Sequence, residues 1–100
     1  MQRGTTPTHF FNLPFDTSLI SCVRVIYAQH DQVVFVKSTA DCIMEGDQIR
    51  VTLTQEDTLL LDCSALVQVQ LRVLTTAGEA LATDVILVGV GKCLDNEVLT

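Results

Sequence analysis

The chain has 100 residues, of which 48% are hydrophobic and 18% are charged, and its formal net charge at pH 7 is −6. This length and composition fit one domain with a buried core, residues 1–100, and argue against disorder. The six lysines and arginines are scattered along an acidic chain and form no basic stripe, which argues against binding to nucleic acid or to an anionic membrane surface.

The first part of the chain is typical of short β-strands joined by turns. The expected strands are Thr6–Leu13, Ile20–Gln29 and Val33–Lys37, with turns at Phe15–Ser18 and His30–Gln32. Their β-branched and aromatic residues favour an extended backbone. Pro7 and Pro14 bound the first strand, and proline lacks a backbone N–H, so we expect this strand at the edge of a sheet.

The middle of the chain continues the pattern and adds one helical turn. A short strand is expected at Cys42–Met44, and Ile49–Thr54 alternates between apolar and polar residues, as a strand with one buried face does. Gln55–Leu61 breaks the alternation and predicts a single turn of helix. Thr54 is its expected cap, and Asp57, three residues further on, completes the pattern of a capping box.

The last part of the chain predicts a β-hairpin. Leu66–Thr75 alternates, with valines and leucines on one face and glutamines and an arginine on the other. Thr76–Glu79 contains a glycine and is the expected turn. Ala80–Val90 is the expected last long strand, and the acidic segment Lys92–Thr100 receives no structural prediction.

These elements favour an all-β fold. About seven strands with turn signals every ~8–12 residues, and no amphipathic helix of useful length, are typical of an immunoglobulin-like antiparallel β-sandwich. A small barrel is the alternative.

The residues that usually carry chemistry form no recognisable site. His9 and His30 are the only imidazoles. His30 and Asp31 are neighbours in an expected turn, which rarely provides the geometry of a catalytic triad. Glu56 and Asp57 fit the start of a helical turn better than a pair of catalytic acids. Because the five glycines form no phosphate-binding loop and tryptophan is absent, we expect a non-enzymatic protein without a cofactor or metal ion.

The cysteines are interpreted as free thiols. They lie at Cys22, Cys42, Cys63 and Cys93. Their spacing lacks the short pairs that are usual in zinc sites. In a protein made in a cytoplasm we expect them reduced and mostly buried, behaving as small hydrophobic groups. Two disulfides, or a metal site, are the alternatives.

Two of the expected strands are apolar on both faces, which predicts a protein interface. Val33–Val36 and Val85–Val90 would flank Leu66–Thr75 in an immunoglobulin-like sheet, and fully apolar strands are either covered on both sides or lie against a partner. The predicted interface consists of Val34, Phe35, Gln68, Gln70, Arg72, Ile86 and Val88. The alternative is that the first strand or the C-terminal tail folds back over this face. If the interface is right, we expect self-association into a dimer or larger oligomer.

Several segments resemble a known group of proteins. Arg3–Thr8, Leu13–Asp16, Leu53–Thr58, Val67–Val73 and Cys93–Leu99 resemble small proteins encoded in phage and prophage regions of Firmicutes. The opening segment also resembles the N-terminal domain of some phage baseplate and tail-fibre proteins. The resemblance implies a virion structural or assembly protein, with other virion proteins as partners, and it brings no catalytic residues.

Three functional hypotheses follow. The first is a non-enzymatic phage structural or assembly module that acts through protein–protein contacts. The second is a small binding module that recognises a ligand or a host protein through loops such as His30–Gln32 or Ala77–Glu79. The third, an enzyme or metalloprotein, has the least support. The N-terminus lacks the apolar stretch of a signal peptide, and no segment has the ~20 apolar residues of a spanning helix, so we expect a protein made in a cytoplasm. The resemblance implies that this cytoplasm is bacterial and that a virion is a further location.

Overall fold

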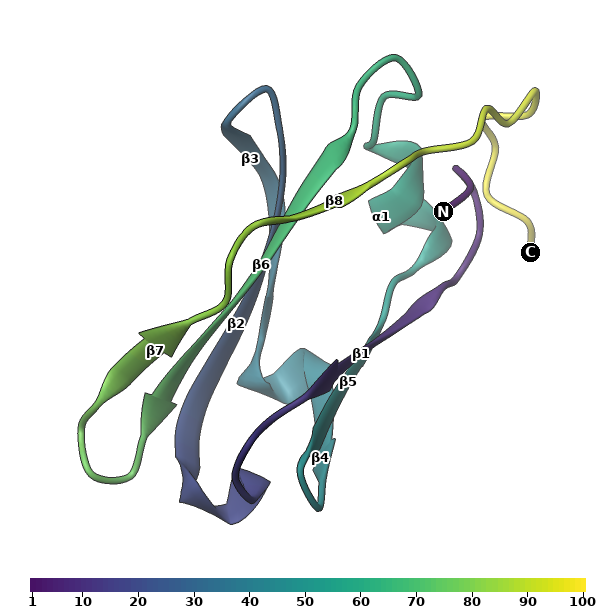
Figure 1. Ribbon diagram of the computed structural model, residues 1–100. Helices are drawn as coiled ribbons and strands as arrows, with labels where there is room; N and C mark the ends of the chain where they lie inside the picture. The colour runs from purple at the N-terminus through teal and green to yellow at the C-terminus, as the bar shows by residue number, and fades with distance from the viewer.

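The computed structural model describes all 100 residues, which form two antiparallel β-sheets packed face to face (Figure 1). In chain order the elements are β1 (Thr8–Asn12), η1 (Thr17–Leu19), β2 (Ile20–Gln29), β3 (Gln32–Ser38), η2 (Thr39–Asp41), β4 (Cys42–Glu45), β5 (Gln48–Thr52), α1 (Gln55–Leu59), β6 (Val67–Thr75), β7 (Ala80–Ala82) and β8 (Ile86–Val88). The prediction of an all-β sandwich is confirmed, with eight strands where about seven were expected.

The smaller sheet has the strand order β1-β5-β4. β1 lies at an edge, as Pro7 and Pro14 predict, and it pairs only with β5. Phe11 of β1 and Ile49 and Val51 of β5 point into the core. Their neighbours along each strand, such as Phe10 and Arg50, point outward.

The larger sheet has the order β3-β2-β6, and β7 and β8 both pair with the far edge of β6. The expectation that Val33–Val36 lies beside Leu66–Thr75 is wrong, because β2 lies between them. A two-residue turn explains this order: His30 and Asp31 have φ values of 53° and 60°, which is the backbone of a tight hairpin. β3 therefore folds directly back onto β2.

The expected last strand, Ala80–Val90, is interrupted. Along β6 there are three steps from Val69 to Arg72, whereas the paired segment takes four steps from Ala82 to Ile86. One extra residue is therefore accommodated between β7 and β8, as in a β-bulge. Because side chains alternate with period two, this insertion exchanges the faces of the residues that follow it.

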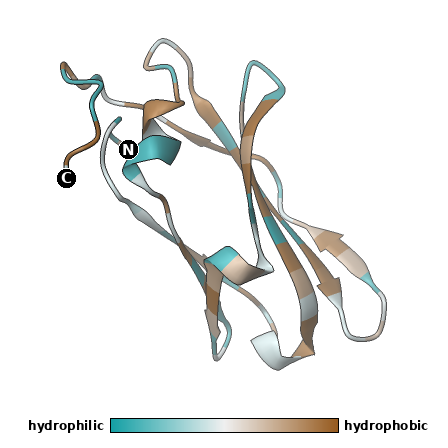
Figure 2. Ribbon diagram, turned by 180° about the vertical axis from the view of Figure 1, so that it is seen from behind, coloured by the Kyte–Doolittle hydropathy of each residue, from teal (hydrophilic) through white to brown (hydrophobic).

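A core of 13 apolar residues lies between the sheets, including Val23, Val25 and Tyr27 of β2 and Val67, Val69 and Leu71 of β6. Hydrophobic and hydrophilic residues alternate along β6, whereas β2 is mainly hydrophobic (Figure 2). The alternation read from the sequence thus places one face of each strand in the core.

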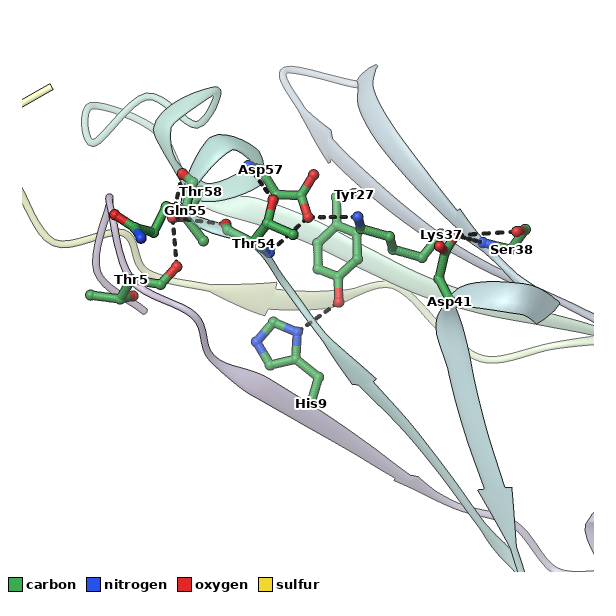
Figure 3. Close-up of polar contacts among 10 residues, drawn as sticks. All are labelled: Thr5, His9, Tyr27, Lys37, Ser38, Asp41, Thr54, Gln55, Asp57 and Thr58. Atoms are coloured by element: carbon green, nitrogen blue, oxygen red, sulfur yellow. Dashed lines mark hydrogen bonds and ion pairs between the residues drawn. The ribbon is translucent and has the colours of Figure 1, made fainter. Parts of the chain in front are cut away.

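The predicted helical turn is present and has the predicted cap. Thr54 Oγ1 accepts a hydrogen bond from the Asp57 N–H, and the Asp57 carboxylate accepts one from the Thr54 N–H, so the capping box is complete (Figure 3). Asp57 Oδ2 also lies 2.6 Å from Nζ of Lys37 in β3. The helix is thereby fixed to the larger sheet.

The two ends of the chain lie together at one end of the sandwich (Figure 1). Gln2 and Gly91 form a parallel bridge, and the Gly91 N–H donates a hydrogen bond to the Met1 carbonyl at 2.6 Å. The tail beyond Gly91 is attached by Arg3 to Asn96, and by Gln55 to the backbone of Leu99.

None of the helices combines the length and the apolar composition needed to cross a membrane.

Candidate protein interface

The side of the larger sheet that faces away from the smaller sheet carries an unusual mixture of side chains. We call it the outer face and define it by Arg24, Ile26, Ala28, Val33, Val36, Gln68, Gln70, Arg72, Leu74 and Leu87. On β2 and β6 these residues alternate with the buried residues. On β3 and β8 they pair with the outward-facing residues of β2 and β6. The face is therefore apolar, with two amides and two guanidinium groups.

The structure places three of the seven predicted interface residues, Gln68, Gln70 and Arg72, on this face. The other four point toward the smaller sheet. Phe35 stacks on Tyr27 with 4.7 Å between ring centroids, and Val34 and Val88 pack against the core. Ile86 lines a hollow of about 240 Å³ between β8 and β1.

The sequence analysis missed Arg24, Ile26 and Leu87 as members of the outer face. Arg24 and Ile26 alternate with Val23, Val25 and Tyr27, so the period-two pattern of β2 was a usable signal. Leu87 belongs to a continuous apolar run, in which no such signal exists.

No other part of the chain covers the outer face. β1 belongs to the smaller sheet, and the tail lies beside the N-terminal segment, so the alternative in which either one folds back over the face is wrong. Val33 is 62% exposed and Leu87 is 58% exposed. Apolar side chains that stay in water in this way are typical of a surface that meets a partner.

The side chains of the two glutamines of the face form hydrogen bonds within the chain. The Gln68 side chain donates to the Asp31 carboxylate and accepts from the Asp31 N–H, which holds the turn between β2 and β3. Gln70 Nε2 donates to the carbonyl of Thr83, between β7 and β8. Their amides therefore satisfy backbone groups at the edges of the sheet.

The two arginines of the face have no such partners. Arg24 and Arg72 are directly opposite each other on β2 and β6, and both are exposed. The ion pairs of the protein are Lys37–Asp57 and Arg50–Glu45, so neither arginine has a carboxylate of its own chain. Like charges at directly opposed positions destabilise a sheet. An acidic chain thus keeps two adjacent cations on an otherwise apolar face.

The outer side of the smaller sheet differs in this respect. Arg50 Nη2 lies 2.8 Å from the Glu45 carboxylate, and the hydroxyls of Thr8 and Thr52 are hydrogen-bonded at 2.8 Å. Its arginine is therefore paired with a carboxylate of the same chain, although Nε of Arg50 has no partner, whereas the outer face carries two arginines without a carboxylate.

The residues considered for chemistry lie apart from one another. No group of three or more His, Cys, Asp or Glu side chains is arranged to hold a metal ion. All four cysteines are free thiols, as expected, but the expectation that most are buried is wrong: Cys22 and Cys63 are exposed, and Cys42 and Cys93 are half-buried. His30 is exposed in its turn.

His9 takes part in the packing between the sheets. Its Nδ1 lies 2.6 Å from the hydroxyl of Tyr27, and the two rings stack at 5.6 Å (Figure 3). Burial, and secondarily the positive N-terminus, lower the pKa of His9. Burial raises the pKa of the Tyr27 hydroxyl well above its usual value, which keeps that hydroxyl protonated. The pair is a structural link between β1 and β2.

The pKa of His9 predicts a pH dependence of stability. In the folded state this pKa lies below its unfolded value, so the unfolded chain binds more protons as the pH falls below ~6.5. We expect the free energy of unfolding to decrease as the pH falls through the unfolded value of about 6.5, and to level off below the folded pKa. Urea titrations across this range measure it. His9→Gln keeps an acceptor for Tyr27 and should flatten the dependence; an unchanged slope in this variant would contradict the assignment.

Comparisons of the chain with protein-family models, with curated proteins and with solved structures found no match. The resemblance to phage and prophage proteins therefore stays a prediction, and the outer face is the feature on which a function can be argued.

Proposed function

We propose that this protein is a non-enzymatic structural or assembly module that acts through protein–protein contacts made by the outer face, beginning with contacts to further copies of itself. The resemblance of its sequence to small phage and prophage proteins supports a role in a virion or its assembly, after synthesis in the bacterial cytoplasm. Other virion proteins are then further partners.

The observation that carries the proposal is the uncovered outer face. It combines exposed Val33 and Leu87 and half-buried Ile26 with the exposed Arg24 and Arg72. Interfaces between proteins are enriched in arginine and in apolar side chains at their centre. On a water-exposed sheet without a partner, this combination would only add the risk of aggregation.

The proposal predicts self-association that depends on Leu87. We expect sedimentation velocity to give a mass above that of one chain at micromolar concentrations, and Leu87→Asp to shift the protein to monomer, because a negative charge would be buried without a partner. Ile43→Asp is the matched control: Ile43 is 59% exposed, like Leu87 at 58%, but lies on the smaller sheet. A wild-type protein that stays monomeric at about millimolar concentration would overturn the proposal.

The exposed thiols provide an independent readout. Cys22 is exposed on β2 two residues before Arg24, whereas Cys63 is exposed in the segment between α1 and β6. Alkylation followed by mass spectrometry should show slower modification of Cys22 at high protein concentration, with no change at Cys63. Equal rates at both sites in an oligomer would place the contact elsewhere.

One observation favours the alternative of a loop-based binding module. A hollow of about 270 Å³ lies at the turn between β6 and β7, next to Thr76, Ala77 and Glu79. It is smaller than the roughly 300–1,000 Å³ of most small-molecule sites, so we place it second.

A further inference from the structure

The charges of the outer face restrict how a second copy can dock. In a symmetric contact each copy would present the same face to the other. If the two-fold axis passed near Arg24 and Arg72, four guanidinium groups would lie together without a carboxylate between them. Like charges placed together in an interface cost several kcal/mol. The residues that define the face include no carboxylate, and Asp31, which borders it, already accepts a bond from Gln68 Nε2. The face therefore requires an acidic surface opposite it.

The C-terminal tail is an acidic surface with the matching composition. Asp95 and Glu97 are both exposed, and they are separated by a single residue. Leu94 is 90% exposed and Leu99 is 73% exposed, the two highest values among the large apolar residues. The segment thus carries two carboxylates together with uncovered apolar side chains, the complement of two guanidinium groups on an apolar sheet.

The tail cannot reach the outer face of its own chain while its attachments hold. Asn96 accepts a hydrogen bond from Arg3, and the Leu99 backbone bonds in both directions with the Gln55 side chain. These contacts keep the tail at the end where the chain termini meet, away from the outer face (Figure 1). Contact between tail and face is therefore between different copies.

The β4–β5 turn is the competing acidic segment. It carries Glu45 and Asp47, but Glu45 is already bonded to Arg50 at 2.8 Å. Exchanging that ion pair for one with another copy gains less than using the unpaired tail carboxylates.

We propose that copies of this protein associate head to tail, with the segment Leu94–Leu99 of one copy docked on the outer face of the next and its carboxylates paired with Arg24 and Arg72. This inference rests on the proposed function. A contact between two different surfaces repeats from copy to copy, so it builds a ring or a filament.

A charge exchange tests the inference. A face variant, Arg24→Glu with Arg72→Glu, and a tail variant, Asp95→Lys with Glu97→Lys, should each weaken self-association at least about tenfold in sedimentation velocity, because charges of the same sign then meet. Mixing the two variants, or combining all four substitutions in one chain, should restore assembly. Circular dichroism checks that each variant is folded.

The outcomes separate the inference from the function on which it rests. Loss of assembly in the face variant alone, with the tail variant unchanged, would overturn the head-to-tail contact but not the role of the face. Loss in both variants without restoration on mixing would overturn direct pairing. The control Glu45→Lys with Asp47→Lys should assemble normally; loss of assembly there and not in the tail variant would overturn the choice of the tail.

Discussion

Replacing Tyr27 with alanine is expected to lower the free energy of unfolding by about 4 kcal/mol, since large aromatic to alanine changes in a core remove both burial and packing. Tyr27 is fully buried, stacks on Phe35 of the same sheet and is hydrogen-bonded to His9 of the other sheet. Domains of this size are stable by only about 5–15 kcal/mol, so this single change removes a large share of the total.

Tyr27→Phe is the matched control for that experiment. It keeps the ring and deletes the hydroxyl, leaving Nδ1 of His9 without its partner, which costs about 1–2 kcal/mol. Because Tyr27 is the only tyrosine and tryptophan is absent, unfolding should be followed by far-ultraviolet circular dichroism. A loss below about 1 kcal/mol in the alanine variant would contradict the central position of this ring.

Replacing Asp57 with alanine is expected to cost about 3 kcal/mol. The change removes the Asp57 half of the capping box, the bond from the Thr54 N–H to the carboxylate, worth about 1 kcal/mol, and leaves Lys37, whose side chain is only 16% exposed, without its anion. Glu56→Ala is the control, because Glu56 is exposed next to Asp57 and makes no ion pair; it should change stability by less than about 0.5 kcal/mol. Chemical denaturation near neutral pH measures both.

Asp57 also makes stability depend on pH. Its pKa is lowered and not raised, so its contribution is lost on the acidic side. Burial opposes its ionisation, but the bonds from Lys37 and from Thr54 outweigh burial, so the pKa of Asp57 lies below its usual value. Its contribution to stability is present above the unfolded pKa of about 4 and is lost as the pH falls through the folded pKa. In the Asp57→Ala variant this acid-side loss should be absent.

Strands with one polar face were predictable because the alternation of apolar and polar residues indicates which side is buried. Leu66–Thr75 was expected as an alternating strand and is observed as β6, with its valines and Leu71 buried, and Thr54 and Asp57 form the expected capping box. In these segments period-two alternation, or a cap at fixed spacing, is a local property of the chain.

The faces of the fully apolar runs could not be predicted in this way. Tyr27 and Ala28 of β2 are consecutive, whereas their partners in β3, Phe35 and Val33, are two steps apart, so Val34 is an inserted residue. A second insertion separates β7 from β8. Each insertion exchanges faces, and a run such as Val33–Val36 gives no alternation from which to detect it.

Contacts between strands far apart in the chain could not be predicted from the sequence either. The pairing of His9 with Tyr27 joins strands of different sheets, and the opposition of Arg24 and Arg72 depends on the register of two strands 40 or more residues apart. Neither is encoded in local spacing. The arginine pair in particular became visible only when β2 was placed next to β6.

The two long sides of the sandwich are built differently. On one side β3 continues through η2 directly into β4, so a short covalent connection joins the two sheets. On the other side β1 faces β8 across a hollow of about 240 Å³, and the segment after β1 (Leu13, Pro14 and Phe15) faces β7 across one of about 270 Å³. β1, β7 and β8 each have one unpaired edge. Thermal opening of the layers would therefore start along the β1 side and pivot on the η2 side, exposing free backbone of β1 first.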